Sequence, residues 1–166
     1  MAYTAAFEQW IPLPLERIFD FFGNPENLPR IMPPWMQVRV DQSVLVQPPD
    51  APMDKRFAGT GSVVTVSFRP FPLLPFRVRS EAKIVSFAMN HFFEDAHSDP
   101  LFKSWNHRHE FVAQDRNHVG GTIARDVITY ELRFGLLSPV VNLLFVAPQM
   151  RRTFEYRQQA VERLLA

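Results

Sequence analysis

The segment from Lys103 to Ala113 carries the densest set of side chains capable of chemistry in this sequence. In a β-strand, successive side chains point to opposite faces of the sheet. One face of this segment would hold Trp105, His107, His109 and Phe111. Two imidazoles, which can exchange protons near neutral pH or bind a metal ion, would therefore lie beside two aromatic rings.

The next predicted strand supplies a carboxylate and a phenol to the same face. If the hairpin turns at residues 116–119, the turn sets a register that keeps both apolar faces together. That register pairs His109 with Asp126, His107 with Ile128, and Trp105 with Tyr130. One inward face is then expected to contain two His, one Asp and one Tyr.

Three uses of this face are open. A His-x-His pair with a nearby carboxylate can bind a divalent metal ion, but no third His or Glu has suggestive spacing, and we expect no metal and no cofactor. In a catalytic interpretation, His109 is a base oriented by Asp126, and Tyr130 donates a proton to a carbonyl. In the interpretation we favour, a buried Asp needs a partner, and the His–Asp pair satisfies itself or anchors one polar end of a ligand.

Further candidates come from other parts of the chain. Arg157 follows Phe154 by three residues in a predicted C-terminal helix, close to its apolar stripe. In one orientation its guanidinium reaches inward, toward Asp126 or a ligand carboxylate. In the other it extends into solvent, and only the aliphatic part of the side chain is packed. Phe68, on a separate predicted strand, is expected to contribute to the same interior.

The elements that must position these side chains follow from apolar spacing and chain breakers. A strand is expected at residues 3–11 and a helix at 15–22, where apolar residues recur with helical spacing. Asn24 and Pro25 are typical of the start of a second short helix, which Pro33 and Pro34 end. Closely spaced β-forming runs then predict an antiparallel meander over residues 36–46, 61–69, 76–87, 89–96, 103–113 and 122–134.

A long helix is expected to follow the meander. Its apolar stripe consists of Val140, Leu143, Leu144, Ala147, Met150, Phe154, Val161, Leu164 and Leu165. Pro148 is expected to kink the helix or split it near Phe145. With no repeat or linker in the sequence, we predict one domain over residues 1–166, of class α+β, in which a curved antiparallel sheet wraps around this helix.

Composition excludes several classes of protein. The chain has no Cys, which rules out disulfides, thiolate zinc sites and a Cys nucleophile. With 18 Lys and Arg against 17 Asp and Glu, it lacks the basic excess that nucleic-acid binding requires. We see no secretory signal, and the longest apolar stretch, at residues 135–147, is too short and too interrupted for a transmembrane segment. A cytoplasmic protein is expected, as a monomer or weak homodimer.

Several motifs resemble the START and birch-pollen-allergen superfamily (SRPBCC), in particular its bacterial ligand-binding members. They are Pro14–Leu28, Trp105–Phe111, Gly121–Thr122, Asp126–Leu132, Phe134–Gly135 and Phe154-x-x-Arg157. The likeness spans nearly the whole chain. It implies the helix-grip fold and a cavity between the sheet and the last helix that holds a hydrophobic small molecule or lipid.

The resemblance implies no particular reaction, because this superfamily uses one scaffold for binding, transport and catalysis. We expect a binding protein rather than an enzyme. The expected ligand-binding residues are Phe68, Trp105, His107, His109, Phe111, Asp126, Ile128, Tyr130, Phe154 and Arg157. One alternative is a polyketide cyclase/dehydratase-like or hydrolase-like enzyme that uses His109, Asp126 and Tyr130. Another is an interaction module that acts through the apolar loop at residues 70–76, where Phe71 and Leu73 either form a contact surface or cap the core.

Overall fold

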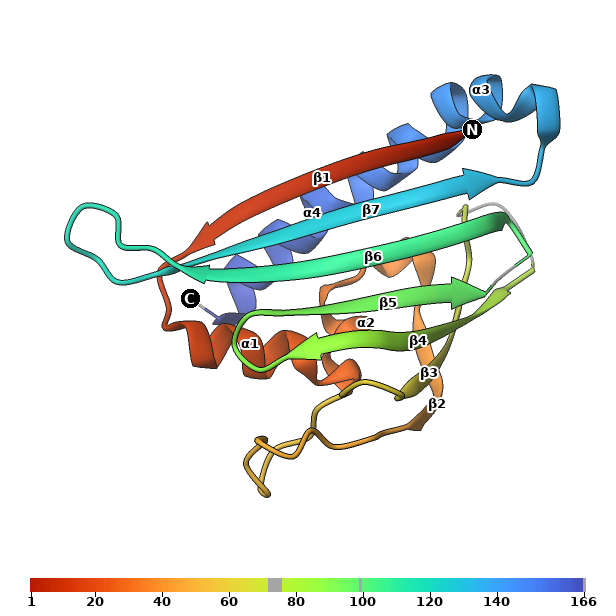
Figure 1. Cartoon of the computed structure of the whole chain (residues 1–166). Coiled ribbons are helices and arrows are strands. Elements are labelled where there is room, and N and C mark those ends of the chain that lie inside the picture. The colour runs from red at the N-terminus through yellow and green to blue at the C-terminus, as the bar shows by residue number, and fades with distance from the viewer. Residues whose placement is uncertain (72–75, 99, 166) are drawn as a thin grey trace.

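The computed structural model describes residues 1–71, 76–98 and 100–165, and Figure 1 shows their arrangement. One antiparallel sheet holds the strands in the order β1-β7-β6-β5-β4-β3-β2. The strands are β1 (Ala2–Ile11), β2 (Arg39–Val44), β3 (Val63–Phe68), β4 (Val78–Ala88), β5 (Phe92–Ser98), β6 (Phe102–Ala113) and β7 (Thr122–Leu132). Irregular pairing between β2 and β3, β4 and β5, and β6 and β7 marks bulges, which bend a sheet. The predicted meander is confirmed.

Short helices follow β1, as expected. They are α1 (Leu15–Gly23), a 3-10 turn (Pro25–Asn27), α2 (Leu28–Ile31) and a second 3-10 turn (Pro34–Met36). The Asn24 side chain accepts a hydrogen bond from the Glu26 backbone N–H, so it caps the first of these turns. Figure 1 shows α1 and α2 below the C-terminal end of the long helix α4 (Ala147–Leu165). This is the helix-grip arrangement.

The C-terminal helical region contains the irregularity predicted near Phe145. A 3-10 turn (Gly135–Leu137) and α3 (Ser138–Val141) lead into a π-helical segment (Asn142–Val146), which continues into α4. The Ala147 N–H donates to the Asn142 carbonyl, five residues earlier. Because proline lacks an N–H and crowds the carbonyl four residues before it, this wider turn accommodates Pro148 within a continuous helix.

The predicted apolar stripe is correct for α4 up to Val161, but it is wrong at Leu164, which is exposed, and wrong before α4. Met150, Phe154 and Val161 are buried, whereas Val140, Leu143 and Leu144 are exposed. The π-helical segment adds one residue to a turn and so shifts the helical phase of everything that precedes it. The inward positions there are Ser138 and the half-buried Val141 and Asn142.

Two packed clusters flank the interior. Phe19, on the inward face of α1, is fully buried. Its ring lies edge-on to those of Phe87, Phe93 and Phe111, below the helix. Below the other helix, α4, the β7 residues Ile128, Tyr130 and Leu132 pack with Met150 and Phe154. Within the described residues, no helix combines the length and apolar character needed to cross a bilayer.

Candidate functional site

A cavity of about 440 Å³ lies between the sheet and the helices. Its walls are mainly apolar side chains from α1, α2, β3, β4 and the C-terminal helical region. Its polar lining includes Ser80, Asp95, His97, His107, His109, Gln149, Thr153 and Arg157. An apolar cavity with a few converging polar groups is the usual form of a small-molecule site.

Six of the ten predicted binding residues line this cavity: Phe68, Trp105, His107, His109, Phe154 and Arg157. The other four lie behind its wall, which corrects the expectation that each would line it. Phe111 belongs to the packed cluster below α1, and Ile128 and Tyr130 lie beneath α4. Asp126 lies behind the two histidines, at a separate small hollow beside Arg157.

The register of the β6–β7 hairpin is confirmed. His109 lies opposite Asp126, His107 opposite Ile128, and Trp105 opposite Tyr130. The bridge between Arg116 and Val119 closes the turn where it was expected.

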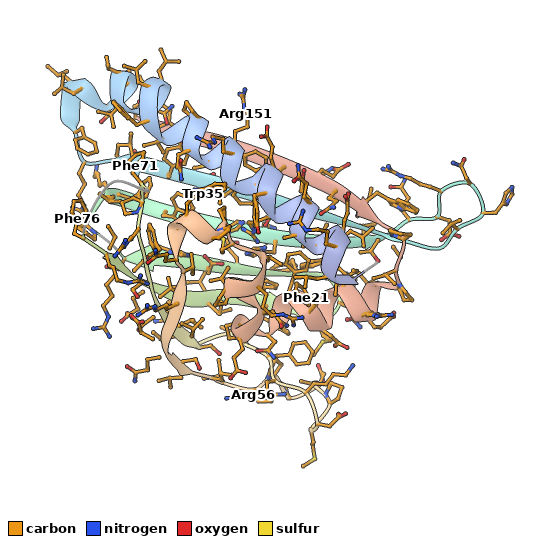
Figure 2. The ribbon with its side chains drawn as sticks, turned by 180° about the vertical axis from the view of Figure 1, so that it is seen from behind. Phe21, Trp35, Arg56, Phe71, Phe76 and Arg151 are labelled. Atoms are coloured by element: carbon orange, nitrogen blue, oxygen red, sulfur yellow. The ribbon has the colours of Figure 1, made fainter. Side chains whose placement is uncertain are left out.

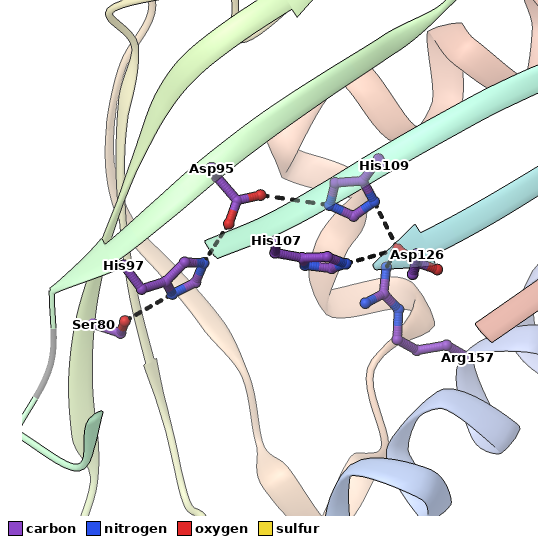
Figure 3. A network of polar contacts seen from close by, with 7 residues as sticks. All are labelled: Ser80, Asp95, His97, His107, His109, Asp126 and Arg157. Carbon is purple, nitrogen blue, oxygen red and sulfur yellow. Dashed lines mark hydrogen bonds and ion pairs between the residues drawn. The ribbon is translucent and has the colours of Figure 1, made fainter. Parts of the chain in front are cut away.

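Asp126 binds both imidazoles through one carboxylate oxygen, as Figure 3 shows. Its Oδ1 lies 2.8 Å from His107 Nε2 and 2.8 Å from His109 Nδ1. The guanidinium of Arg157 comes from α4 and reaches within 3.9 Å of the same oxygen. Arg157 therefore points inward, the first of the two orientations considered for it.

Asp95 on β5 extends this network toward a third histidine (Figure 3). Asp95 Oδ1 lies 3.5 Å from His109 Nε2, and Oδ2 lies 2.7 Å from His97 Nε2. The other ring nitrogen of His97 lies 3.0 Å from the Ser80 hydroxyl. A chain of polar side chains thus runs from β4 across the sheet to α4.

Groups of opposite charge lie next to one another in this network. Burial disfavours the charged form of His109, but Asp126 and Asp95 on either side outweigh it and raise the His109 pKa. Burial also opposes ionisation of the two carboxyls, yet His97 and His109 beside Asp95, and Arg157 and His109 beside Asp126, hold the pKa of each below its usual range. The two carboxylates thus favour the imidazolium form of His109 between them, and Arg157 adds a positive charge beside Asp126.

His107 is in the opposite state. Burial and the adjacent charge of His109 lower the pKa of His107 to about 4, although Asp126 acts in the other direction. At pH 7 the ring is neutral. Since Nε2 faces the Asp126 carboxylate, the proton belongs on Nε2, which leaves Nδ1 as the basic nitrogen of a residue on the cavity wall.

Tyr130 is bound to a different partner. Its hydroxyl donates to Asn142 Oδ1 at 2.6 Å, and burial raises its pKa. This bond fastens the π-helical segment to β7. The phenol predicted as a proton donor is therefore placed outside the cavity lining.

One subset of the network could hold a metal ion. Asp95, His107 and His109 each offer a ligand atom, and these atoms lie within 4.8 Å of one another. A metal would need an unprotonated nitrogen on His109, whereas the two carboxylates favour the doubly protonated ring. The expectation that no metal is resident stays a prediction.

Sequence reasoning missed Asp95 and gave no role to His97. The predicted strand ended at Ala96, which left His97 just beyond its end, but β5 continues to Ser98. Strand alternation from Phe93 through Asp95 to His97 was the signal that could have found both residues. The loop at residues 70–76 is only partly described, because residues 72–75, Leu73 among them, lie outside the described residues.

Comparison with known families adds one match. A family model described as polyketide cyclase / dehydrase and lipid transport matches residues 11–158. No curated protein shows significant similarity to the chain.

Solved structures of the same fold are numerous. The crystal structure of Ara h 8.0201 has 14% identity and a TM-score of 0.64, with 98% of this chain and 97% of that chain covered. Protein Ms6760 from Mycobacterium smegmatis has 16% identity and a TM-score of 0.63, with 98% and 90% covered. Truncated norcoclaurine synthase from Thalictrum flavum has 11% identity and a TM-score of 0.63, with 99% and 94% covered. At these identities the likeness shows the fold alone.

Proposed function

Because this chain belongs to the polyketide cyclase/dehydrase and lipid transport family, within the START and birch-pollen-allergen superfamily, we propose that it binds a hydrophobic small molecule or lipid that carries one polar group. The observation that carries the proposal is the cavity of about 440 Å³, whose apolar walls enclose a buried Asp–His–Arg network. That volume is within the range of ligand pockets, roughly 300 to 1,000 Å³.

The arrangement of polar atoms supports an oriented ligand. Its apolar body would lie against the Phe, Met, Val and Ile side chains of the walls, and its polar group would face His107 and Arg157. Two further cavity-lining residues, Trp105 and Gln149, carry buried N–H donors without a hydrogen-bond partner among the described residues. Because unpaired buried donors are costly, an acceptor on the ligand would stabilise the complex.

Native mass spectrometry of the purified protein tests this proposal, together with a thermal-shift panel of fatty acids, sterols and aromatic polyketides. We expect a co-purified apolar mass, or stabilisation by about 2.7 kcal/mol at a ligand concentration one hundred times Kd. Val66 lines the cavity, so Val66→Phe should abolish both effects. The matched control is Val85→Phe, which enlarges an exposed side chain outside the cavity lining and should retain them. Wild-type protein with neither a bound mass nor a response to any panel member would contradict the proposal.

Catalysis in the same cavity is the second candidate, and the neutral His107 favours it. The sequence assigned cyclase, dehydratase or hydrolase chemistry to His109, Asp126 and Tyr130. The contacts support other roles: His107 Nδ1 takes a proton from the ligand, while Asp126 and His109 position its ring.

Mutagenesis separates catalysis from binding. For an enzyme, His107→Gln should abolish turnover yet change ligand affinity by less than about tenfold, or ~1.4 kcal/mol. Tyr130→Phe should leave turnover intact, because its hydroxyl is bound to Asn142. Equal losses of affinity and turnover in His107→Gln would favour plain binding.

A further inference from the structure

The surface beside the cavity carries a dense cluster of exposed apolar side chains. We call it the mouth patch, and it consists of Phe134, Leu136, Leu137, Val140, Leu143, Leu144 and Phe145. Leu136 is 99% exposed and Leu143 is 71% exposed. Single exposed apolar residues are common, but seven within twelve positions mark a surface that meets a partner or a membrane.

The fold holds these side chains outward. Val140, Leu143 and Leu144 have helical spacing and share one face of the α3 and π-helical region. The opposite face is fastened to the sheet, because Asn142 accepts the hydrogen bond from Tyr130. The patch therefore cannot turn inward without breaking that bond.

The mouth patch is continuous with the cavity. Phe134 and Phe145 line the cavity and are also exposed, at 44% and 52%. The Phe145 ring meets that of Phe71, another lining residue, edge-on at 6.4 Å between centroids. Figure 2 places Phe71 below the end of the helical region that carries the patch. An apolar ligand that left the cavity here would pass directly between patch residues.

Along the chain the patch is bordered by arginines, with Glu131 and Glu155 just beyond the bordering segment. From Leu132 to Phe154 the chain contains Arg133, Arg151 and Arg152 and no Asp or Glu. All three arginines are exposed, and Figure 2 shows Arg151 projecting away from α4. Apolar side chains flanked by arginines suit the interface of an anionic bilayer. The acyl region accommodates the apolar side chains, and the anionic headgroups attract the arginines.

We propose that the mouth patch docks this protein on an anionic lipid surface, with the cavity opening against the bilayer. The patch is too short to span a membrane, so the protein would lie at the interface. Docking itself needs no ligand. Only its use, the transfer of an apolar ligand between bilayer and cavity, rests on the proposed function.

Vesicle flotation tests the docking. We expect wild-type protein to bind phosphatidylcholine vesicles that contain phosphatidylglycerol, and to bind pure phosphatidylcholine vesicles more weakly. The double variant Leu136→Ser, Leu143→Ser should bind at least about tenfold more weakly, because it removes two apolar side chains that would insert at the edge of the acyl region. The control pair, Met53→Ser with Val112→Ser, removes two exposed apolar side chains outside the patch and should bind as wild type does.

Charge is tested separately. Arg151→Gln with Arg152→Gln should lower binding to the anionic vesicles about tenfold and leave binding to neutral vesicles unchanged. Added salt should reproduce this loss.

Two results would overturn the proposal. One is the absence of a patch-dependent interaction with vesicles, seen either as no binding by wild-type protein or as wild-type binding by the leucine variant. The other is a wild-type dimer in light scattering that becomes a monomer in the leucine variant without vesicle binding, since the patch would then join two copies. Leu136 and Leu143 do not line the cavity, so native mass spectrometry of the same variant reports on ligand retention independently.

Discussion

His107 should make the stability of this protein depend on pH within one defined window. The ring is 7% exposed and its pKa in the folded chain is about 4, against 6.5 when unperturbed. Between these values the unfolded chain binds a proton that the folded chain does not. Stability therefore falls as the pH falls from about 6.5 to about 4, by about 3 kcal/mol in all.

The neighbouring groups act outside this window. The pKa of His109 is raised, so its contribution is complete below pH 6.5 and is lost as the pH rises through its folded pKa. The pKa values of Asp95 and Asp126 are lowered, so their contributions are present above the usual 3.8 and are lost at more acidic pH. Of these three shifted groups and His107, only His107 changes stability between pH 4 and 6.5.

Urea unfolding at a series of pH values measures this effect. The free energy of unfolding should fall by about 3 kcal/mol more in wild type than in His107→Gln between pH 7 and pH 4. His91→Gln, which changes an exposed histidine, should follow the wild-type curve. Parallel curves for wild type and His107→Gln would refute a buried, neutral His107 and, with it, its assignment as the base.

Three further outcomes follow from the same contacts. Asp126→Asn should destabilise the fold by about 3 to 5 kcal/mol in urea unfolding, because it leaves the buried His109 charge underpaired; a loss under about 1 kcal/mol would contradict the charge assignment. Phe19→Ala should cost about 3 to 5 kcal/mol, since Phe19 is fully buried among aromatic rings, and calorimetry would show a lowered Tm. Elemental analysis of purified protein should find no stoichiometric divalent ion; one equivalent would place a metal at Asp95 and the two histidines.

Local rules were enough to predict much of the site. Strand alternation and a single hairpin turn determine the register of β6 and β7, so the pairing of His109 with Asp126 could be read from the sequence. The face that each side chain occupies was therefore correct. Whether a side chain on that face reaches the cavity depends on what covers it, and α4 covers Ile128 and Tyr130.

Other features depend on contacts between distant segments. Asp95 joins the site because β5 lies next to β6, and His97 because β5 runs two residues past its predicted end. In the π-helical segment, backbone N–H groups bond to carbonyls five residues earlier instead of four. The spacing of apolar residues in the sequence does not indicate this change. The π-helical segment determines which apolar residues of the C-terminal region are buried. The predicted stripe therefore assigned Val140, Leu143 and Leu144 of the mouth patch to the buried face.

The pairing of β1 with β7 has a consequence for how the chain acquires its structure. These strands are joined from Ala2–Glu131 to Ile11–Thr122, across more than one hundred residues of intervening chain. Contacts of such long sequence separation slow folding, because the loop between them must close first. During synthesis, β1 would leave the ribosome long before its only partner strand in the described sheet, and α4 would follow later still. The aromatic interior would thus be open to other proteins for most of translation, a period in which a chaperone that holds apolar segments would raise the yield of folded protein.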